Sequence, residues 1–154
     1  MVEYVKFPSL QSSESKKVTI PETANEFFAE YLKPTPSTTF ILQPQKQRNK
    51  DFRHEHYNQY YNKVKVDGAG YNFHFEKGRM YLAHGNYIKI EGLSTAPLIT
   101  KEEAKQAFAS YKEIPVTEVT GFMADLLIKE ISKISGKDTP YHYRTHWCVD
   151  NCKR

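Results

Sequence analysis

The clearest pattern of apolar and polar positions lies between Tyr57 and Gly92. Apolar and polar residues alternate there in two runs, Val64–Val66 and Tyr71–Phe75, which is the period of a half-buried strand. Glycine tolerates positive φ, so three dipeptides in this stretch are typical of turns: they are Asp67-Gly68, Lys77-Gly78 and Gly85-Asn86. We therefore predict three or four antiparallel strands in a meander, with one buried face and one wet face.

Before this stretch the pattern predicts one helix and one strand. Residues 1–20 are largely polar and serine-rich, which indicates a flexible lead-in. Pro21 then suits a first helical turn, and apolar residues follow at spacings of three and four until Pro34 stops the helix. Thr38–Leu42 reads as a short strand, and Gln43–Lys50 as a polar, basic loop.

After Gly92 the helix signal is strongest at Thr100. Thr100 and Glu103 form a T-x-x-E capping box, which predicts a helix over residues 100–113 that ends before Pro115. Residues 117–134 carry both a helical stripe and a strand-like alternation, and periodicity does not decide between them. The aromatic segment Tyr141–Val149 is strand-like.

Composition narrows the function classes. The net charge of +4 is small and its basic residues are dispersed, so we expect a solvated surface and no nucleic-acid partner. No apolar run is long enough to span a bilayer, and we expect no membrane insertion. The N-terminus has no apolar signal core. The protein is therefore either cytoplasmic, or secreted or in the cell envelope after loss of a signal peptide.

Motifs for catalysis are missing from the sequence. It contains no H-E-x-x-H, no phosphate-binding glycine motif and no G-x-S-x-G. The acidic pair Glu102 and Glu103 is explained by helix capping. His74 alternates with Phe73 and Phe75, so we place it on the wet face of the sheet as an ordinary strand histidine. We predict a protein that is not an enzyme and needs no cofactor.

One alternative is a metal site at the C-terminus. Two His and two Cys form the ligand set of a structural zinc site: they are His142, His146, Cys148 and Cys152. The i, i+4 spacing within each pair would place both ligands on one side of a helix. Zinc signatures, however, separate their ligand pairs by a longer stretch of chain. A frayed tail or a local disulfide is the competing interpretation.

Residues 59–104 contain motifs that resemble a known family. Gln59–Gly68 resembles the Q-x-Y-x-G-[IV]-x-V-x-G core of the fungalysin/thermolysin propeptide family, and the pieces up to Gly85-Asn86-Tyr87 resemble its next strands. Leu98–Ala104 resembles the opening of a PepSY-type segment. Two positions depart from the family pattern: Lys63 replaces its turn glycine, and His56 replaces its usual arginine. Lys63 must therefore adopt a left-handed conformation or relax the turn.

The resemblance implies a fold and a role. The fold is α+β, with a cystatin-like antiparallel sheet packed on one or two helices. Its parts are a lead-in (1–20), a propeptide-like helix and sheet (21–92), a PepSY-like segment (93–140) and a tail (141–154), all in one compact unit. The implied role is to bind, chaperone or inhibit the catalytic domain of a thermolysin-like zinc metalloprotease.

The sheet would supply the contact surface for that partner, because tyrosine is enriched at protein interfaces. The predicted contact residues are Tyr57, Gln59, Tyr61, Tyr71, Phe73, Tyr81 and Tyr87. Two alternatives remain open at this point. One is a stand-alone interaction or structural domain that has lost its protease, and the other is a small metal-binding protein that uses the C-terminal cluster.

Overall fold

The structure is a computed structural model that describes residues 3–8, 19–46, 51–131 and 142–149. The chain divides into two compact units, Met1–Glu91 and Gly92–Arg154, each with its own strands and at least one helix. The first unit contains the stretch with the strongest strand pattern. No helix in the described part of the chain is long and apolar enough to cross a membrane.

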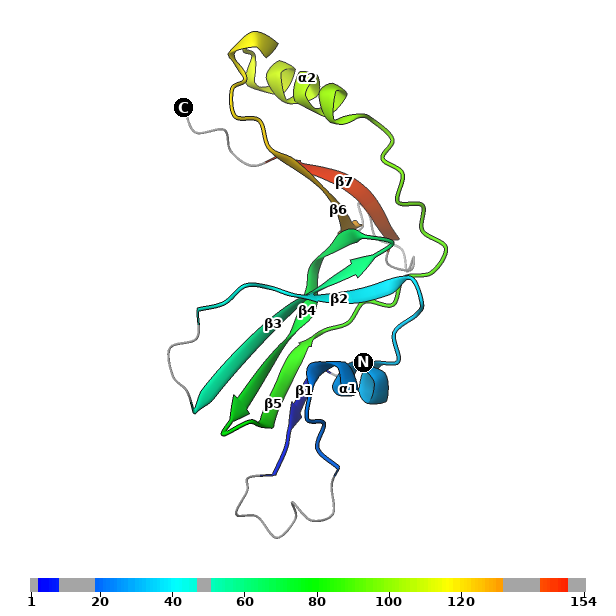
Figure 1. Cartoon of the computed structure of the whole chain (residues 1–154). Helices are drawn as coiled ribbons and strands as arrows, with labels where there is room; N and C mark the ends of the chain where they lie inside the picture. Colours follow the sequence, from blue (N-terminus) through cyan, green and yellow to red (C-terminus); the bar gives the residue numbers. More distant parts are fainter. Residues whose placement is uncertain (1–2, 9–18, 47–50, 132–141, 150–154) are drawn as a thin grey trace, which may run out of the picture. The chain divides into compact units, whose positions relative to one another are not determined.

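The first unit is built on an antiparallel sheet, shown in Figure 1. From one edge to the other, its strands are β1 (Tyr4–Lys6), β5 (Arg79–Asn86), β4 (Val64–Glu76), β3 (Phe52–Tyr61) and β2 (Thr38–Leu42). Strands β3, β4 and β5 form the predicted meander, and β2 has the bounds that the sequence predicted. The α+β class with an antiparallel sheet is confirmed.

Two of the three predicted turns are wrong. Lys77-Gly78 does join β4 to β5, but Asp67-Gly68 lies inside β4 and Gly85-Asn86 lies at the end of β5. At Gly68 the positive φ of 70° produces a bulge instead of a hairpin. Asn58 pairs with Gly70 while Tyr60 pairs with Lys65, so β4 bends and then continues beside β3. Alternation and a turn dipeptide therefore do not distinguish a bulge from a turn.

The helical segment of the first unit is short. Helix α1 (Ala24–Phe27) continues directly into the π-helix η2 (Phe28–Leu32). The N-cap is Thr23, whose side chain accepts a hydrogen bond from the Glu26 N–H at 3.2 Å, so Pro21 precedes the helix and the predicted start was too early. Lys33 ends the helix with a φ of 47°, immediately before Pro34.

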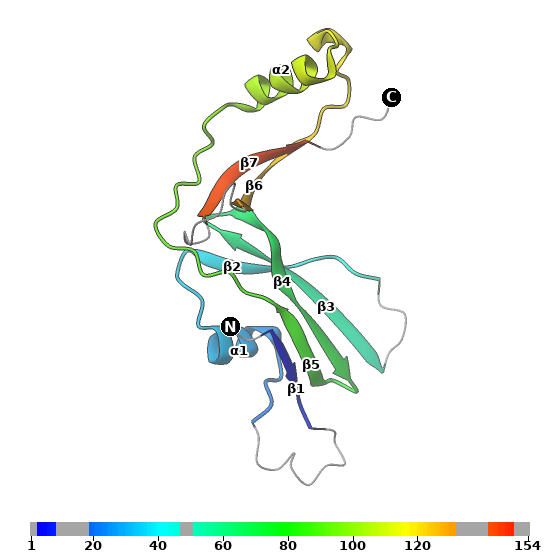
Figure 2. The ribbon, with the colours of Figure 1, turned by 180° about the vertical axis from the view of Figure 1, so that it is seen from behind.

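Aromatic rings join this helix to the sheet. Phe27 lies 5.2 Å from Phe73 between ring centroids, and Phe28 stacks on Phe40 at 4.0 Å. The cluster consists of buried residues from β4, β5, α1, η2 and the segment after β1: they are Phe7, Ala24, Phe27, Phe28, Leu32, Tyr71, Phe73, Phe75, Met80 and Ala83. Edge-to-face and stacked ring pairs add to the burial of apolar area, so this cluster holds α1 and η2 on one face of the sheet. Figures 1 and 2 both show α1 close to β1.

The second unit contains a helix and a β-hairpin. Helix α2 (Lys101–Lys112) has the predicted capping box between Thr100 and Glu103, and a 3-10 turn, η3 (Val116–Glu118), follows it. The ambiguous segment is strand β6 (Ala124–Ile131), which pairs antiparallel with β7 (His142–Val149). Ile128 is fully buried, and the Trp147 indole N–H donates to the Ile99 carbonyl at 2.9 Å. Long-range pairing with β7 thus decides what periodicity left open.

Candidate functional site

The two faces of the first unit's sheet differ in character. One face packs on α1 and η2 through the aromatic cluster. The opposite face is named the open face here, because its side chains range from half-buried to exposed. By register and strand alternation it carries His54, His56 and Asn58 from β3, Asn72 and His74 from β4, and Leu82 and His84 from β5. The strand alternation predicted from the sequence therefore does separate a buried face from a wetter one.

Gln59 is the buried polar residue at the centre of the motif region. Its side chain is fully buried, and its amide group donates to the Ile88 carbonyl at 2.6 Å and accepts from the Ile88 N–H at 2.9 Å. These two bonds pair the Gln59 amide with the Ile88 backbone as a neighbouring strand would, so the Gln59 side chain holds the segment that follows β5 in place. Ile88 and Ile90 are buried in that segment. Both polar ends of the buried amide are satisfied, which burial requires.

The β3–β4 hairpin turns at Asn62 and Lys63. Their φ angles are 46° and 69°, and Tyr61 pairs with Val64 directly across the two-residue loop. Positive φ at both central residues defines a type I′ turn. Lys63 therefore adopts the left-handed conformation that glycine adopts more easily, at a cost of about 1 kcal/mol. Of the two outcomes that the sequence left open, the structure has the strained turn.

Two glycines let the three central strands approach closely. A Cβ on Gly70 would lie 2.3 Å from the Tyr57 carbonyl oxygen, and one on Gly85 would lie 2.1 Å from the Gly70 carbonyl oxygen. Neither position has space for any other residue. The Gly85 of the predicted turn dipeptide is thus required for close packing between strands.

A polar hollow of about 430 Å³ lies on the open face beside this close approach. His56 is among its lining residues, with Nδ1 at 2.8 Å from the Asn72 amide oxygen and Nε2 at 3.0 Å from the Asn58 amide oxygen. Lys65 and Asp67 from the bulge also line the hollow. Hydrogen-bonding groups line it together with apolar surface. The sequence did not reveal it, because the bulge that brings these residues together was predicted to be a turn.

Three histidines form a row across the open face, which we name the histidine ladder: His54, His74 and His84. His54 Nδ1 lies 2.6 Å from His74 Nδ1, and His74 Nε2 lies 3.0 Å from His84 Nε2. The prediction that His74 lies on the wetter face is confirmed by its partly exposed position. Its place at the centre of a row was missed, because that depends on the β3–β4 and β4–β5 registers. A correct hairpin register would have paired His54 with His74.

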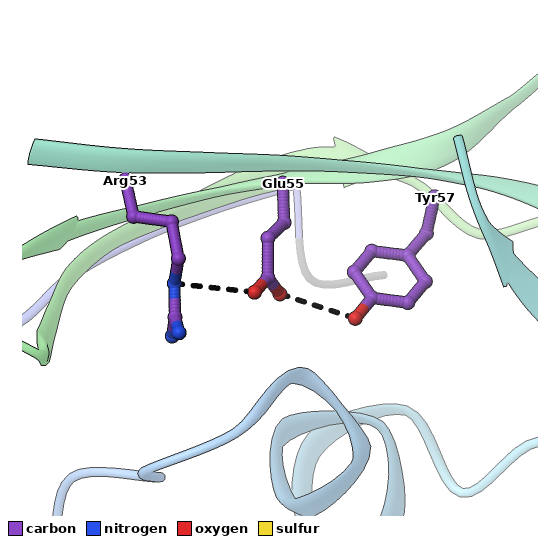
Figure 3. A network of polar contacts seen from close by, with 3 residues as sticks. All are labelled: Arg53, Glu55 and Tyr57. Carbon is purple, nitrogen blue, oxygen red and sulfur yellow. Dashed lines mark hydrogen bonds and ion pairs between the residues drawn. The ribbon is translucent and has the colours of Figure 1, made fainter. Parts of the chain in front are cut away.

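A second polar row lies on the covered face of β3, and Figure 3 shows its three side chains pointing to the same side. Arg53 Nε lies 3.2 Å from the Glu55 carboxylate, and the Tyr57 hydroxyl donates to that carboxylate at 3.1 Å. Burial, followed by the Glu55 charge, raises the pKa of Tyr57 to about 12. Arg53 also lies over the Phe75 ring at 4.1 Å. This row closes one side of the aromatic core, and its polar groups are bonded to one another.

The predicted contact residues divide into two groups. Gln59, Tyr61, Tyr71 and Phe73 are buried, and they form the interior of the sheet. Tyr57, Tyr81 and Tyr87 are half-buried. Tyr81 extends from β5 beside the His74 ring, with 6.0 Å between the centroids. The predicted partner contact therefore has accessible area only at the half-buried tyrosines.

The C-terminal metal hypothesis falls mostly outside the described residues. The backbone of His142, His146 and Cys148 lies in strand β7 rather than in the helix that the spacing suggested. Their side chains and all of Cys152 lie outside the described part of the structure. Among the residues that the structure does describe, no group of three or more His, Cys, Asp or Glu side chains converges to hold a metal ion.

The described geometry defines a class of protein domain: an antiparallel sheet with an aromatic core on one face and a polar, histidine-rich face on the other. Residues 43–87 match the family model described as the fungalysin/thermolysin propeptide motif. This match covers β3, β4 and β5, and therefore Gln59, the β3–β4 hairpin and the histidine ladder. The match does not reach Leu98–Ala104, so the PepSY-like resemblance stays a prediction. A search of curated proteins found no match.

Proposed function

We propose that residues 21–92 form a non-catalytic, propeptide-like module that binds the catalytic domain of a thermolysin-like zinc metalloprotease and chaperones or inhibits it. The observation that carries the proposal is the match of residues 43–87 to the propeptide motif, because it coincides with the three central strands of the sheet. The proposal includes a cystatin-like arrangement of this sheet. It also implies an extracellular or cell-envelope setting, since the partner class is secreted.

The open face supplies the contact surface in this proposal. Besides Tyr81, it carries apolar side chains that are largely exposed: by register these are Tyr4, Ile41 and Phe52, with exposed fractions of 63%, 47% and 40%. Aromatic side chains bury a large area with little loss of conformational entropy, so they suit a protein partner. On the covered face the aromatic rings of the core pack on α1 and η2, and Leu42 at the end of β2 is the exposed apolar side chain that register places there.

Inhibition of a thermolysin-like protease tests the proposal directly. The full chain is titrated into a purified zinc metalloprotease of this class, and hydrolysis of a peptide substrate and complex formation are both measured. Inhibition and binding at micromolar concentration or below are expected. Substitution Tyr81→Ala should weaken binding at least tenfold, because an aromatic hot spot at the centre of an interface is typically worth about 2 kcal/mol or more.

The matched control is Tyr111→Ala in α2, which removes an 81% exposed tyrosine outside the matched segment. This variant should bind as tightly as the unchanged chain. Absence of binding at high micromolar concentration would favour the alternative of a stand-alone interaction domain. Equal effects of both substitutions would place the contact somewhere other than the open face.

A further inference from the structure

The histidine ladder has a fixed number of proton positions. Its three rings have six nitrogens, and four of them meet in the two N···N contacts of 2.6 and 3.0 Å. Each contact holds one proton, donated by one ring and accepted by the other. Three neutral imidazoles carry three protons in total. Two protons therefore occupy the contacts and the third lies on an end nitrogen, either His54 Nε2 or His84 Nδ1, whichever tautomers are present.

One additional proton fits this row without loss of either contact. It occupies the second end nitrogen, so both end nitrogens and both contacts then hold one proton each. A second additional proton has no such place, because it must enter a contact that already holds one. Two N–H groups then face each other, and that hydrogen bond is lost. The hydrogen-bond inventory of imidazole therefore sets the capacity of the intact ladder at one extra proton.

Most of the charged and titratable side chains that register places on the strands beside the ladder are neutral or basic. The other titratable or charged side chains on this face, from every strand beside the ladder, are Tyr4 and Lys6 on β1, His56 on β3, Glu76 on β4, and Arg79 and Tyr81 on β5. Glu76 alone among them is acidic, and it pairs in register with Arg79. Burial, followed by the neighbouring His54 and His84, lowers the pKa of His74. Burial and the two neighbouring imidazoles thus disfavour a charged central ring.

We propose that the histidine ladder is a proton-sensing site: it binds one proton with its contacts intact, and further protonation breaks the row and weakens the β3–β4–β5 sheet. A metal is the competing ligand for three imidazoles, but within the described residues these rings do not converge on one point. This inference does not depend on the proposed protease partner.

The direction of the pH effect follows from linkage. The unfolded chain accepts all three extra protons near the ordinary histidine pKa of about 6.5, whereas the folded ladder excludes two of them. The stability that the ladder contributes is present above that pH and is lost as the pH falls below it. Each excluded proton raises the unfolding equilibrium constant about tenfold between pH 7.5 and 5.5. The histidine ladder should therefore raise the unfolding equilibrium constant by up to about a hundredfold over that interval.

The test is a graded set of variants in the full chain, unfolded with urea at both pH values in the presence of a metal chelator. His54→Phe or His84→Phe leaves one contact and one excluded proton, so the ladder's contribution should fall to about tenfold. His74→Phe removes both contacts, so that contribution should disappear. His56→Gln on the same face is the control and should keep most of the acid sensitivity.

Nitrogen-15 NMR of the imidazole rings in the unchanged chain provides a readout that does not rely on the variants. One ladder proton should be taken up in a first step, and the other two only in later, more acidic steps. The proposal is overturned if all three rings protonate together in one step. It is also overturned if His74→Phe is as acid-sensitive as the unchanged chain.

Discussion

At the scale of single residues, the buried Gln59 side chain holds the segment after β5 through two hydrogen bonds to Ile88. A polar side chain in the interior of a sheet is unfavourable unless both ends of its amide are bonded. The Ile88 N–H and carbonyl satisfy both ends, at 2.9 and 2.6 Å. Gln59 is also the first residue of the motif that resembles the propeptide family. Gln59 therefore has a structural role in this chain that is separate from any contact with a partner.

Removal of this amide gives a residue-scale prediction. Gln59→Ala should lower the free energy of unfolding by about 2–4 kcal/mol, because it leaves two buried backbone groups without partners and opens a cavity. Urea unfolding followed by far-UV circular dichroism measures the change. The control, Gln45→Ala in the exposed segment after β2, should change stability by less than about 0.5 kcal/mol. A loss for Gln59→Ala as small as the control's would show that the contact with Ile88 contributes little.

The histidine ladder depends on strand register, which the sequence does not reveal. His54, His74 and His84 are 10 or 20 residues apart along the chain, and their types alone suggest nothing beyond surface histidines. Only the registers of two hairpins bring them into a row. Register in turn depends on the bulges after Asn58 and His74, which no periodicity rule locates.

At the scale of elements, the β3–β4 hairpin carries a strained turn. Lys63 has a φ of 69°, where the resembling family has glycine. Lys63→Gly should stabilise the chain by about 1 kcal/mol, because glycine adopts this conformation without a Cβ clash. Thermal unfolding measures the gain.

Lys65→Gly is the matched control for this hairpin, since it makes the same change within β4 at a residue that lacks positive φ. It should destabilise the chain, because glycine weakens a strand interior. If both glycine variants destabilise the protein to a similar degree, the turn at Lys63 is not strained.

The elements predicted from the sequence were those with local causes. The capping box of α2 and the strand Thr38–Leu42 agree with the structure because capping and alternation act over a few residues. The turn at Asp67-Gly68 was wrong and the segment 117–134 was undecided, because their outcome depends on pairing with distant strands. For the candidate site, the sequence predicted the motif strands and the wet position of His74. It missed the polar hollow and the ladder, which exist only once the strands are in register.

At the scale of the whole molecule, the matched motif lies within one of the two compact units. Residues 43–87 include β3, β4 and β5, and β1, β2, α1 and η2 complete that unit. The two faces of its sheet differ: one packs the aromatic core, and the other presents exposed aromatic and histidine side chains. This division is the physical basis for proposing a binding module with no catalytic step of its own.

Hydrogen exchange of the full chain, with and without a saturating concentration of a thermolysin-like catalytic domain, tests the central claim most directly. The account predicts slower amide exchange in residues 52–86, which form β3, β4 and β5, while α2 is unchanged. Tyr81→Ala should reduce this protection and Tyr111→Ala should leave it intact. Unchanged exchange throughout residues 52–86 at saturation would contradict the claim that this sheet is a protease-binding module.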